Sequence, residues 1–155
     1  MQTFENIQGA ENGFSTIRGS FTAEPLFSYF KAEGWSKEGI QWADVEPVTK
    51  DVGADGLGTN NTRPVIYEGT ATFKPNSSTR GYLDRVCTLS NIEFGKTPTA
   101  YELTYTEINY LTNTKTIYSG GSVTTFQSGN SATMDDGQQD KKYIFKFFQR
   151  VILPL

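Results

Sequence analysis

The side chains that most often carry catalysis are scarce in this chain. It has 155 residues, with no histidine and a single cysteine, Cys87. Without histidine, the chain can supply neither a Ser/His or Cys/His nucleophilic pair nor a histidine ligand for a metal. Cys87 follows Leu83 and Val86 at helical spacing, which favours a small buried hydrophobic residue over a nucleophile. We therefore predict no catalytic residues, no metal and no cofactor.

Carboxylates remain as candidates for acid–base chemistry. Two of them on either side of a cleft could cleave a glycosidic bond, and Glu68, Glu102 and Glu107 lie in or near segments that are predicted as strands. Nothing in their spacing places two of them together. We interpret them as acids on the solvent face of amphipathic strands, and we predict that the protein is not an enzyme.

Segment 51–63 is a long polar stretch rich in glycine and asparagine. Asp51 and Asp55 resemble part of a calcium loop, but Thr62 stands where that loop requires a glutamate. Loops of more than about 12 residues inside a compact domain are usually functional or disordered. We therefore expect a functional loop here that binds no metal.

Composition limits the possible partners. A net charge of −3 argues against a broad basic surface for nucleic acid. No run approaches the roughly 18 apolar residues of a membrane-spanning helix, and the start has no signal-peptide pattern, so we expect a non-secreted protein without a membrane partner.

The charge is unevenly distributed, since residues 1–60 carry a net −5 and residues 61–155 carry a net +2. This asymmetry could favour head-to-tail contact between copies, and solvated loops of mixed sign explain it equally well.

Alternation of apolar and polar residues, which is typical of half-buried strands, recurs along the chain. It predicts strands at 13–23, 26–31, 40–48, 64–74, 99–106, 115–127 and 142–153. We expect the last of these to be one long strand that closes the core. The alternation changes phase after Tyr105, because Ile108 and Tyr110 become the apolar pair. This change predicts a β-bulge near Glu107.

One helix is expected after the capping residues 76–78. It would turn Asp84 and Arg85 toward solvent and bury Leu83, Val86 and Cys87. Residues 1–155 are thus predicted to form a single domain of the mainly β class. Its architecture would be an antiparallel β-sandwich or partial barrel with one flanking α-helix.

The order of several short motifs resembles a known family. The motifs GFSTIRGSF, DVGADG and VIYEGTATFKPNSSTRGYLDRV are followed by the ending KYIFKFFQRVILPL. The positions that carry the likeness are Gly53, Ala54, Asp55, Gly56, Gly69, Thr70, Asn76 and Ser77. Over most of residues 13–155 the chain resembles the tail tube proteins of tailed bacteriophages, particularly those with contractile tails.

This resemblance implies a structural virion protein. Copies would form hexameric rings, and the rings would stack into a hollow tube through which DNA passes during ejection without specific binding. It implies tail sheath, baseplate and terminator proteins as partners, and a place in the virion tail after assembly in the host cytoplasm. The same fold serves the inner tubes of type VI secretion systems and contractile bacteriocins.

The resemblance also gives roles to two sets of residues. Segment 51–63 would be an inter-subunit loop that acts through Asp51, Gly53, Asp55, Gly56, Asn60, Asn61 and Arg63. Polar strand positions would line a wet lumen, and the candidates are Glu68, Thr70, Thr72, Glu102, Thr104 and Thr106.

Two alternatives stay open. One is another virion component, such as a tail terminator or a sheath-associated or capsid-decorating β-domain, which would not stack into a tube. The other is a carbohydrate-binding β-sandwich, in which Trp35, Trp42 and surface tyrosines form a stacking platform. Aromatic residues at alternate strand positions are more often part of the core.

Overall fold

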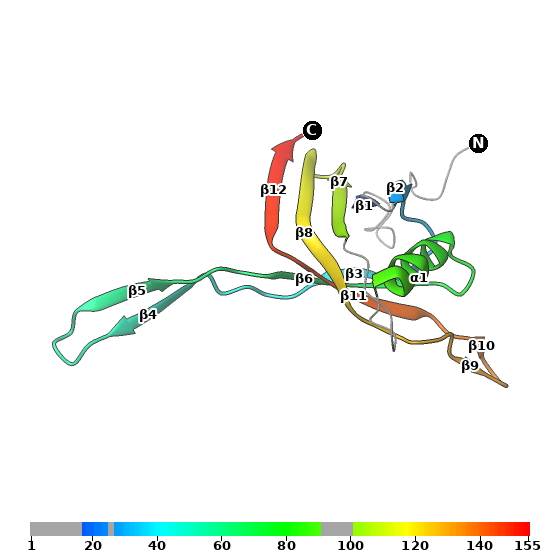
Figure 1. Ribbon diagram of the computed structural model, residues 1–155. Helices are drawn as coiled ribbons and strands as arrows, with labels where there is room; N and C mark the ends of the chain where they lie inside the picture. Colours follow the sequence, from blue (N-terminus) through cyan, green and yellow to red (C-terminus); the bar gives the residue numbers. More distant parts are fainter. Residues whose placement is uncertain (1–16, 25–26, 91–100) are drawn as a thin grey trace.

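A computed structural model describes residues 17–24, 27–90 and 101–155. One helix and twelve strands occur in this part of the chain (Figure 1). Their bounds are β1 (Ile17–Glu24), β2 (Phe27–Lys31), β3 (Trp35–Trp42), β4 (Val48–Val52), β5 (Gly58–Thr62), β6 (Tyr67–Phe73), α1 (Ser78–Ser90), β7 (Glu102–Asn109), β8 (Thr114–Phe126), β9 (Ala132–Thr133), β10 (Gly137–Gln138), β11 (Lys141–Phe147) and β12 (Gln149–Pro154).

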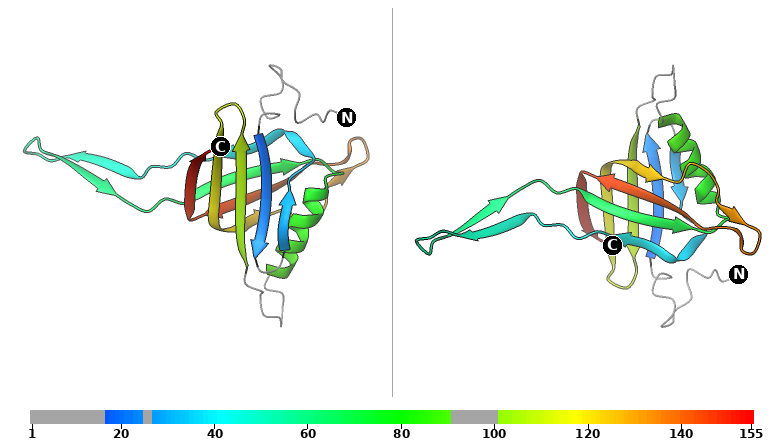
Figure 2. Two further views of the ribbon diagram at one scale, coloured as in Figure 1. Left: turned by 90° about the horizontal axis from the view of Figure 1, so that it is seen from above. Right: turned by 90° about the horizontal axis from the view of Figure 1, so that it is seen from below.

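Eight of the strands form one antiparallel sheet that folds back on itself. The order is β2-β1-β7-β8-β11-β6-β3, and β12 also pairs with β8. The first part of β8 lies between β7 and β12, and its last part pairs with β11. We call β2-β1-β7-β8-β12 the first half-sheet and β8-β11-β6-β3 the second half-sheet. Strands of the two halves cross in Figure 2, and the described strands do not close into a barrel. The predicted class, mainly β and antiparallel with one helix, is confirmed.

Strand β8 bends at a pair of glycines. Gly120 has a φ of +66°, which residues with a side chain rarely adopt. The register between β7 and β8 is interrupted at this point, between Leu103 and Tyr105. The expected bulge near Glu107 is therefore wrong, because β7 pairs with β1 without a shift along its whole length. The apolar pattern changes phase there because Glu107 itself occupies an inward-facing position.

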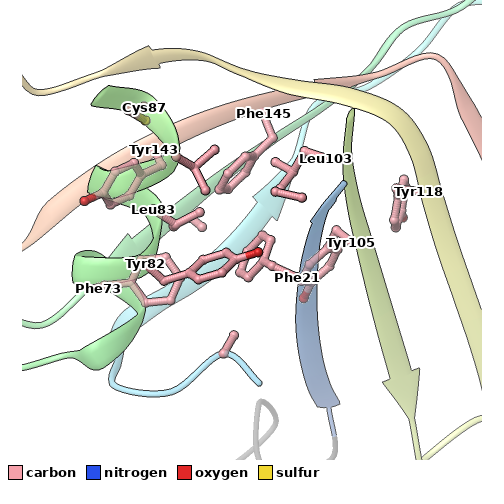
Figure 3. Packing of buried hydrophobic residues seen from close by; sticks show 14 of the residues in the cluster. Phe21, Phe73, Tyr82, Leu83, Cys87, Leu103, Tyr105, Tyr118, Tyr143 and Phe145 are labelled. Atoms are coloured by element: carbon pink, nitrogen blue, oxygen red, sulfur yellow. The ribbon is translucent and has the colours of Figure 1, made fainter. Parts of the chain in front are cut away.

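Aromatic rings fill the space between the half-sheets (Figure 3). Phe21 of the first half lies 5.3 Å from Phe145 of the second, measured between ring centroids. Trp42 stacks on Tyr118 at 4.1 Å. Such ring pairs contribute about 0.5–1.5 kcal/mol beyond the burial of their area. The core is therefore what holds the two halves face to face.

Helix α1 covers one end of this core, as predicted. The Ser77 hydroxyl accepts a hydrogen bond from the amide of Thr79 at 3.2 Å and so caps the helix. Its buried face contributes Tyr82, Leu83, Val86 and Cys87. Arg85 is exposed as expected, but Asp84 is not turned fully to solvent. It accepts hydrogen bonds from the buried Lys141 at 2.8 Å and from the Tyr143 hydroxyl at 2.6 Å.

Two strand predictions need correction. The segment 142–153 forms two strands and not one. The first strand ends before Phe148, where the chain bends and passes from the second half-sheet to the first. The strand expected at 40–48 instead spans Trp35–Trp42. The sequence after it, up to Pro47, forms no strand.

Gly121 offers a direct test of the bend in β8. A Cβ atom at this position would lie 2.2 Å from a ring carbon of the buried Phe147. We expect Gly121→Ala to lower the free energy of unfolding by about 1–3 kcal/mol, because the packed core must shift to admit the methyl group. Gly129→Ala is the matched control, since a Cβ there meets nothing within 4 Å. Urea unfolding of both variants measures the difference, and equal stabilities would contradict the tight packing at Gly121.

Candidate assembly interface

The segment predicted as a loop is mostly a β-hairpin. Strands β4 and β5 pair from Val48↔Thr62 to Val52↔Gly58. The turn between them is closed by a hydrogen bond from the amide of Gly53 to the carbonyl of Leu57 at 2.9 Å. We call residues 48–62 the arm. Val48 and Val52 are the only apolar residues of its two strands, so the sustained apolar alternation that signals a strand is missing from the sequence.

Most residues proposed for the inter-subunit loop have a local structural role in the arm. Asp55 accepts a hydrogen bond from the amide of Leu57 at 3.1 Å, and Gly56 takes a φ of +82° in the turn. Asp51 accepts a hydrogen bond from Asn61 at 3.4 Å, and Asn60 pairs with Lys50.

Arg63 links the two segments of chain that lead into and out of the arm. Its guanidinium lies 3.3 Å from the Glu46 carboxylate and also donates to the carbonyl of Glu46 at 3.0 Å. Both side chains are exposed, so this ion pair adds little stability.

The arm projects from the body and exposes apolar side chains (Figure 1). All of β5 is exposed, and in β4 only Thr49 is partly covered. Val52 is 74% exposed and Leu57 is 68% exposed. A two-stranded hairpin that packs on nothing is marginally stable in water. The arm therefore has the properties of a segment that a neighbouring molecule covers.

Strand β12 is a second exposed apolar element, which the sequence analysis assigned to the core. All six of its residues pair with β8, and among the described strands β8 is its one neighbour. Val151, Ile152 and Leu153 are each between 42% and 55% exposed. An apolar strand with one unpaired edge is a template for pairing with another chain. The sequence contains a sign of this exposure, because the three consecutive apolar residues 151–153 put apolar groups on both faces of the strand.

The polar positions proposed for a lumen fall on two different surfaces. On β7, Glu102, Thr104 and Thr106 share a face with the paired residues Glu24, Thr22 and Ser20 of β1. On β6, Glu68, Thr70 and Thr72 share a face with the paired residues Lys146, Ile144 and Lys142 of β11. Each set lies on the outer face of its half-sheet, because the alternate residues of both strands point into the common core. The structure thus keeps each set together and places the two sets on opposite sides of the domain.

Glu107 is a partly buried acid that the sequence analysis placed at the solvent face. Burial raises the pKa of its carboxyl, while the neighbouring Trp42 and Tyr105 side chains partly oppose the rise. Glu68 and Glu102 lie on the two outer faces, so the three acids do not meet in a cleft. The inward position of Glu107 could have been predicted from the sequence, because Leu103, Tyr105 and Glu107 occupy alternate positions of one strand and therefore share a face.

The two tryptophans do not form a binding platform. Trp35 packs on Phe73 at 4.6 Å, and Trp42 stacks on Tyr118 within the core. The carbohydrate-binding alternative thereby loses its two tryptophans. In the described ranges, no group of three acidic or cysteine residues is arranged to hold a metal. No helix within them is long and apolar enough to cross a membrane.

The comparisons with known proteins concern the fold. No protein-family model matches the chain, and no curated protein matches it in sequence. It is similar to a chain in the 6-fold symmetrised structure of the anti-feeding prophage baseplate, with a TM-score of 0.53, 13% identity, and coverage of 89% of this chain and 92% of that chain. It is also similar to a chain in the anti-feeding prophage cap, a tube-terminating cap, with a TM-score of 0.50, 8% identity, and coverage of 90% and 89%. The tail-tube-like fold that the sequence resemblance implied is confirmed.

The partly buried carboxylate of Glu107 predicts a pH-dependent stability. Since the pKa of Glu107 is raised above its ordinary value of 4.5, the folded protein holds this proton more tightly than the unfolded chain. The stabilisation is present at low pH and is lost as pH rises through the raised pKa. We expect Glu107→Gln to gain in melting temperature relative to the parent as pH increases from about 4 to 8. Glu102→Gln, at an exposed position of the same strand, is the control. An equal pH trend in both variants would contradict the assignment.

Proposed function

We propose that the protein is a structural subunit of a phage-type tail tube, in which hexameric rings stack into a channel for DNA. The observation that carries this proposal is the unfinished first half-sheet, which ends in the exposed apolar strand β12. The likeness of fold to chains of the anti-feeding prophage baseplate and tube-terminating cap supports a tail component more generally.

Ring formation follows from the two edges of the first half-sheet. Strands β2 and β12 lie at its opposite edges, so β12 of one copy can pair with β2 of the next. Such an interface joins two different surfaces, and it closes into a ring when the rotation between copies divides a full turn. Every copy would then cover its two edges without a change in its own fold.

In such a ring, the outer face of the first half-sheet lines the channel. This face presents Glu102, Thr104 and Thr106, and the β6 set lies on the outside of the ring. Arg18 and Lys115 lie on the same face toward the other ends of the strands, where both flank Ile108. A polar face of mixed sign lacks the continuous positive charge that would hold DNA through counterion release. DNA could therefore slide through this channel.

The remaining surfaces suit the partners of a tail. Sheath proteins would contact the outer face of the second half-sheet, and baseplate and terminator proteins would contact the two ends of the tube. The protein would lie in the tail of the particle after assembly in the host cytoplasm.

A tail terminator is the second candidate. The fold is nearly as similar to the tube-terminating cap as to the baseplate chain, with TM-scores of 0.50 and 0.53. A terminator would form single rings through the same β12 edge. It would not stack into tubes.

Electron microscopy of the purified protein separates these candidates. We expect negative-stain images at high protein concentration to show hollow tubes with ring-like end views, and light scattering to rise steeply with concentration. Single rings that never stack would favour the terminator. A strict monomer across the concentration series would contradict both candidates.

The arm can be tested independently of the fold. We expect replacement of residues 48–62 by a short Gly-Ser linker to leave a folded monomer that no longer forms tubes, because the arm packs on nothing within the domain. Circular dichroism and thermal unfolding check the fold, and electron microscopy checks assembly. Normal tubes from this variant would exclude the arm from the mechanism.

A further inference from the structure

Opposite charges lie at the two ends of the outer face of the first half-sheet. Glu24 is the last residue of β1 and Glu102 is the first residue of β7, and both side chains are exposed. At the other end of the same face, Arg18 and Lys115 flank Ile108 and are partly exposed. We call Glu24 and Glu102 the acidic rim, and Arg18 and Lys115 the basic rim. A strand rises about 3.4 Å per residue, so the two rims are about 20 Å apart along β7.

The acidic rim brings two carboxylates together. Glu24 and Glu102 are direct partners in the register between β1 and β7, and like charges in such a pair are destabilising. The Glu102 carboxylate accepts a hydrogen bond from the amide of Gly120 at 3.1 Å. That bond holds the side chain in place but brings no positive charge. A cation from another molecule would therefore relieve the repulsion in this rim.

The basic rim is surrounded by apolar and aromatic groups. Lys115 pairs with Ile108 on one side and with Leu153 on the other, so its two cross-strand neighbours carry no carboxylate. Arg18 lies over the ring of Tyr110, with its guanidinium carbon 5.9 Å from the ring centroid. This contact positions the guanidinium without neutralising it. The rim thus presents positive charge at its end of the sheet.

Strand directions determine how the rims are arranged in a ring of copies. Every neighbouring pair in the order β2-β1-β7-β8-β12 is antiparallel. The edge strands β2 and β12 are four such steps apart, so they run in the same direction. Rotation about the channel axis preserves this direction, and β12 of one copy would pair in parallel with β2 of the next. All copies of a ring then place their acidic rims on one side and their basic rims on the other.

The ends of the strands face the neighbouring rings. The strands of the first half-sheet run side by side in Figure 2, and in a ring built through β12 and β2 their hydrogen bonds follow the circumference. Rings that stack in one direction bring an acidic rim against a basic rim. Rings that stack in alternating directions bring like charges together, which costs free energy. Charge therefore favours stacking in one direction.

From these observations we propose that the acidic rim of one ring binds the basic rim of the next ring. The proposal rests on the proposed assembly into stacked rings, and it identifies the residues that join the rings and give the tube a direction. Each exposed ion pair contributes little by itself. The symmetry of the ring repeats the contact in every copy, so the small contributions add up.

Reversal of whole rims tests the contact. One variant combines Glu24→Lys with Glu102→Lys, and a second combines Arg18→Glu with Lys115→Glu. Each should raise the protein concentration required for tubes about tenfold or more, because both rims then carry the same sign. Rings should persist, since β2 and β12 are unchanged. The variant with all four substitutions exchanges the signs of the rims and should form tubes again near the parent concentration.

Negative-stain electron microscopy distinguishes rings from tubes in each variant, and circular dichroism with thermal unfolding checks the fold. The matched control is Asp135→Lys with Asp136→Lys, which makes the same change of charge in the exposed turn between β9 and β10. It should form tubes as the parent does. An equal loss of tubes in this control would overturn the rim contact.

The outcomes separate the rim contact from the assembly itself. Tubes from a folded single-rim variant at the parent concentration would overturn the rim contact and leave the proposed function intact. Rings of the folded four-substitution variant that do not stack would do the same. Parent rings that never stack would overturn the rim contact and favour the terminator. A strictly monomeric parent would overturn the proposed function and the rim contact together.

Salt tests the contact without any substitution. The Debye length falls from about 10 Å at 0.1 M salt to about 3 Å at 1 M. We expect tubes of the parent to separate into rings over this range, while the rings, joined through backbone hydrogen bonds and apolar side chains of β12, remain. Light scattering follows the change and electron microscopy identifies the products. Tubes that keep their length at about 1 M salt would contradict the rim contact.

Discussion

The fold depends on the packing of aromatic rings between two half-sheets that share one strand. Strand β8 can serve both halves only because it bends at Gly120 and Gly121, where Phe147 occupies the place that a side chain would take. This bend sets Tyr118 against Trp42 and brings Phe21 to Phe145. The position of every other element, including the two edges and the arm, follows from this shared strand.

The same arrangement leaves β12 with a strand partner on one edge only, and it leaves the arm outside the main sheet, among the described strands. After β11 has completed the second half-sheet, the chain crosses to the first at Phe148 and continues as β12 along β8. No described strand covers its far edge. The pair β3–β6 likewise runs past the core and continues as the arm. The core thus buries the inward faces of both half-sheets, and apolar side chains such as Ile152 and Leu57 remain exposed.

The sequence predicts the buried elements well and the assembly surfaces poorly. Alternation located β1, β6 and β7, and the capping residues located α1, because in these elements burial of one face selects the residue types. The arm was missed as a hairpin because neither face of it is buried by its own chain. Glu107 was misplaced for a related reason: it is only partly buried, beside the polar groups of Trp42 and Tyr105, so an acid occurs where the pattern requires an apolar residue.

The distribution of the exposed apolar groups determines what kind of assembly the fold can support. In an isologous dimer a single patch meets itself, whereas here the exposed apolar strand β12 and the strand β2, with the exposed Tyr29, lie at opposite edges of the first half-sheet. Contacts between such different surfaces are head-to-tail, so they propagate until rotation closes them into a ring. A shared strand edge can fix that rotation, because backbone hydrogen bonds tolerate little change in register. The arm, which leaves the body beyond β12, can then span the junction that the strand edge creates.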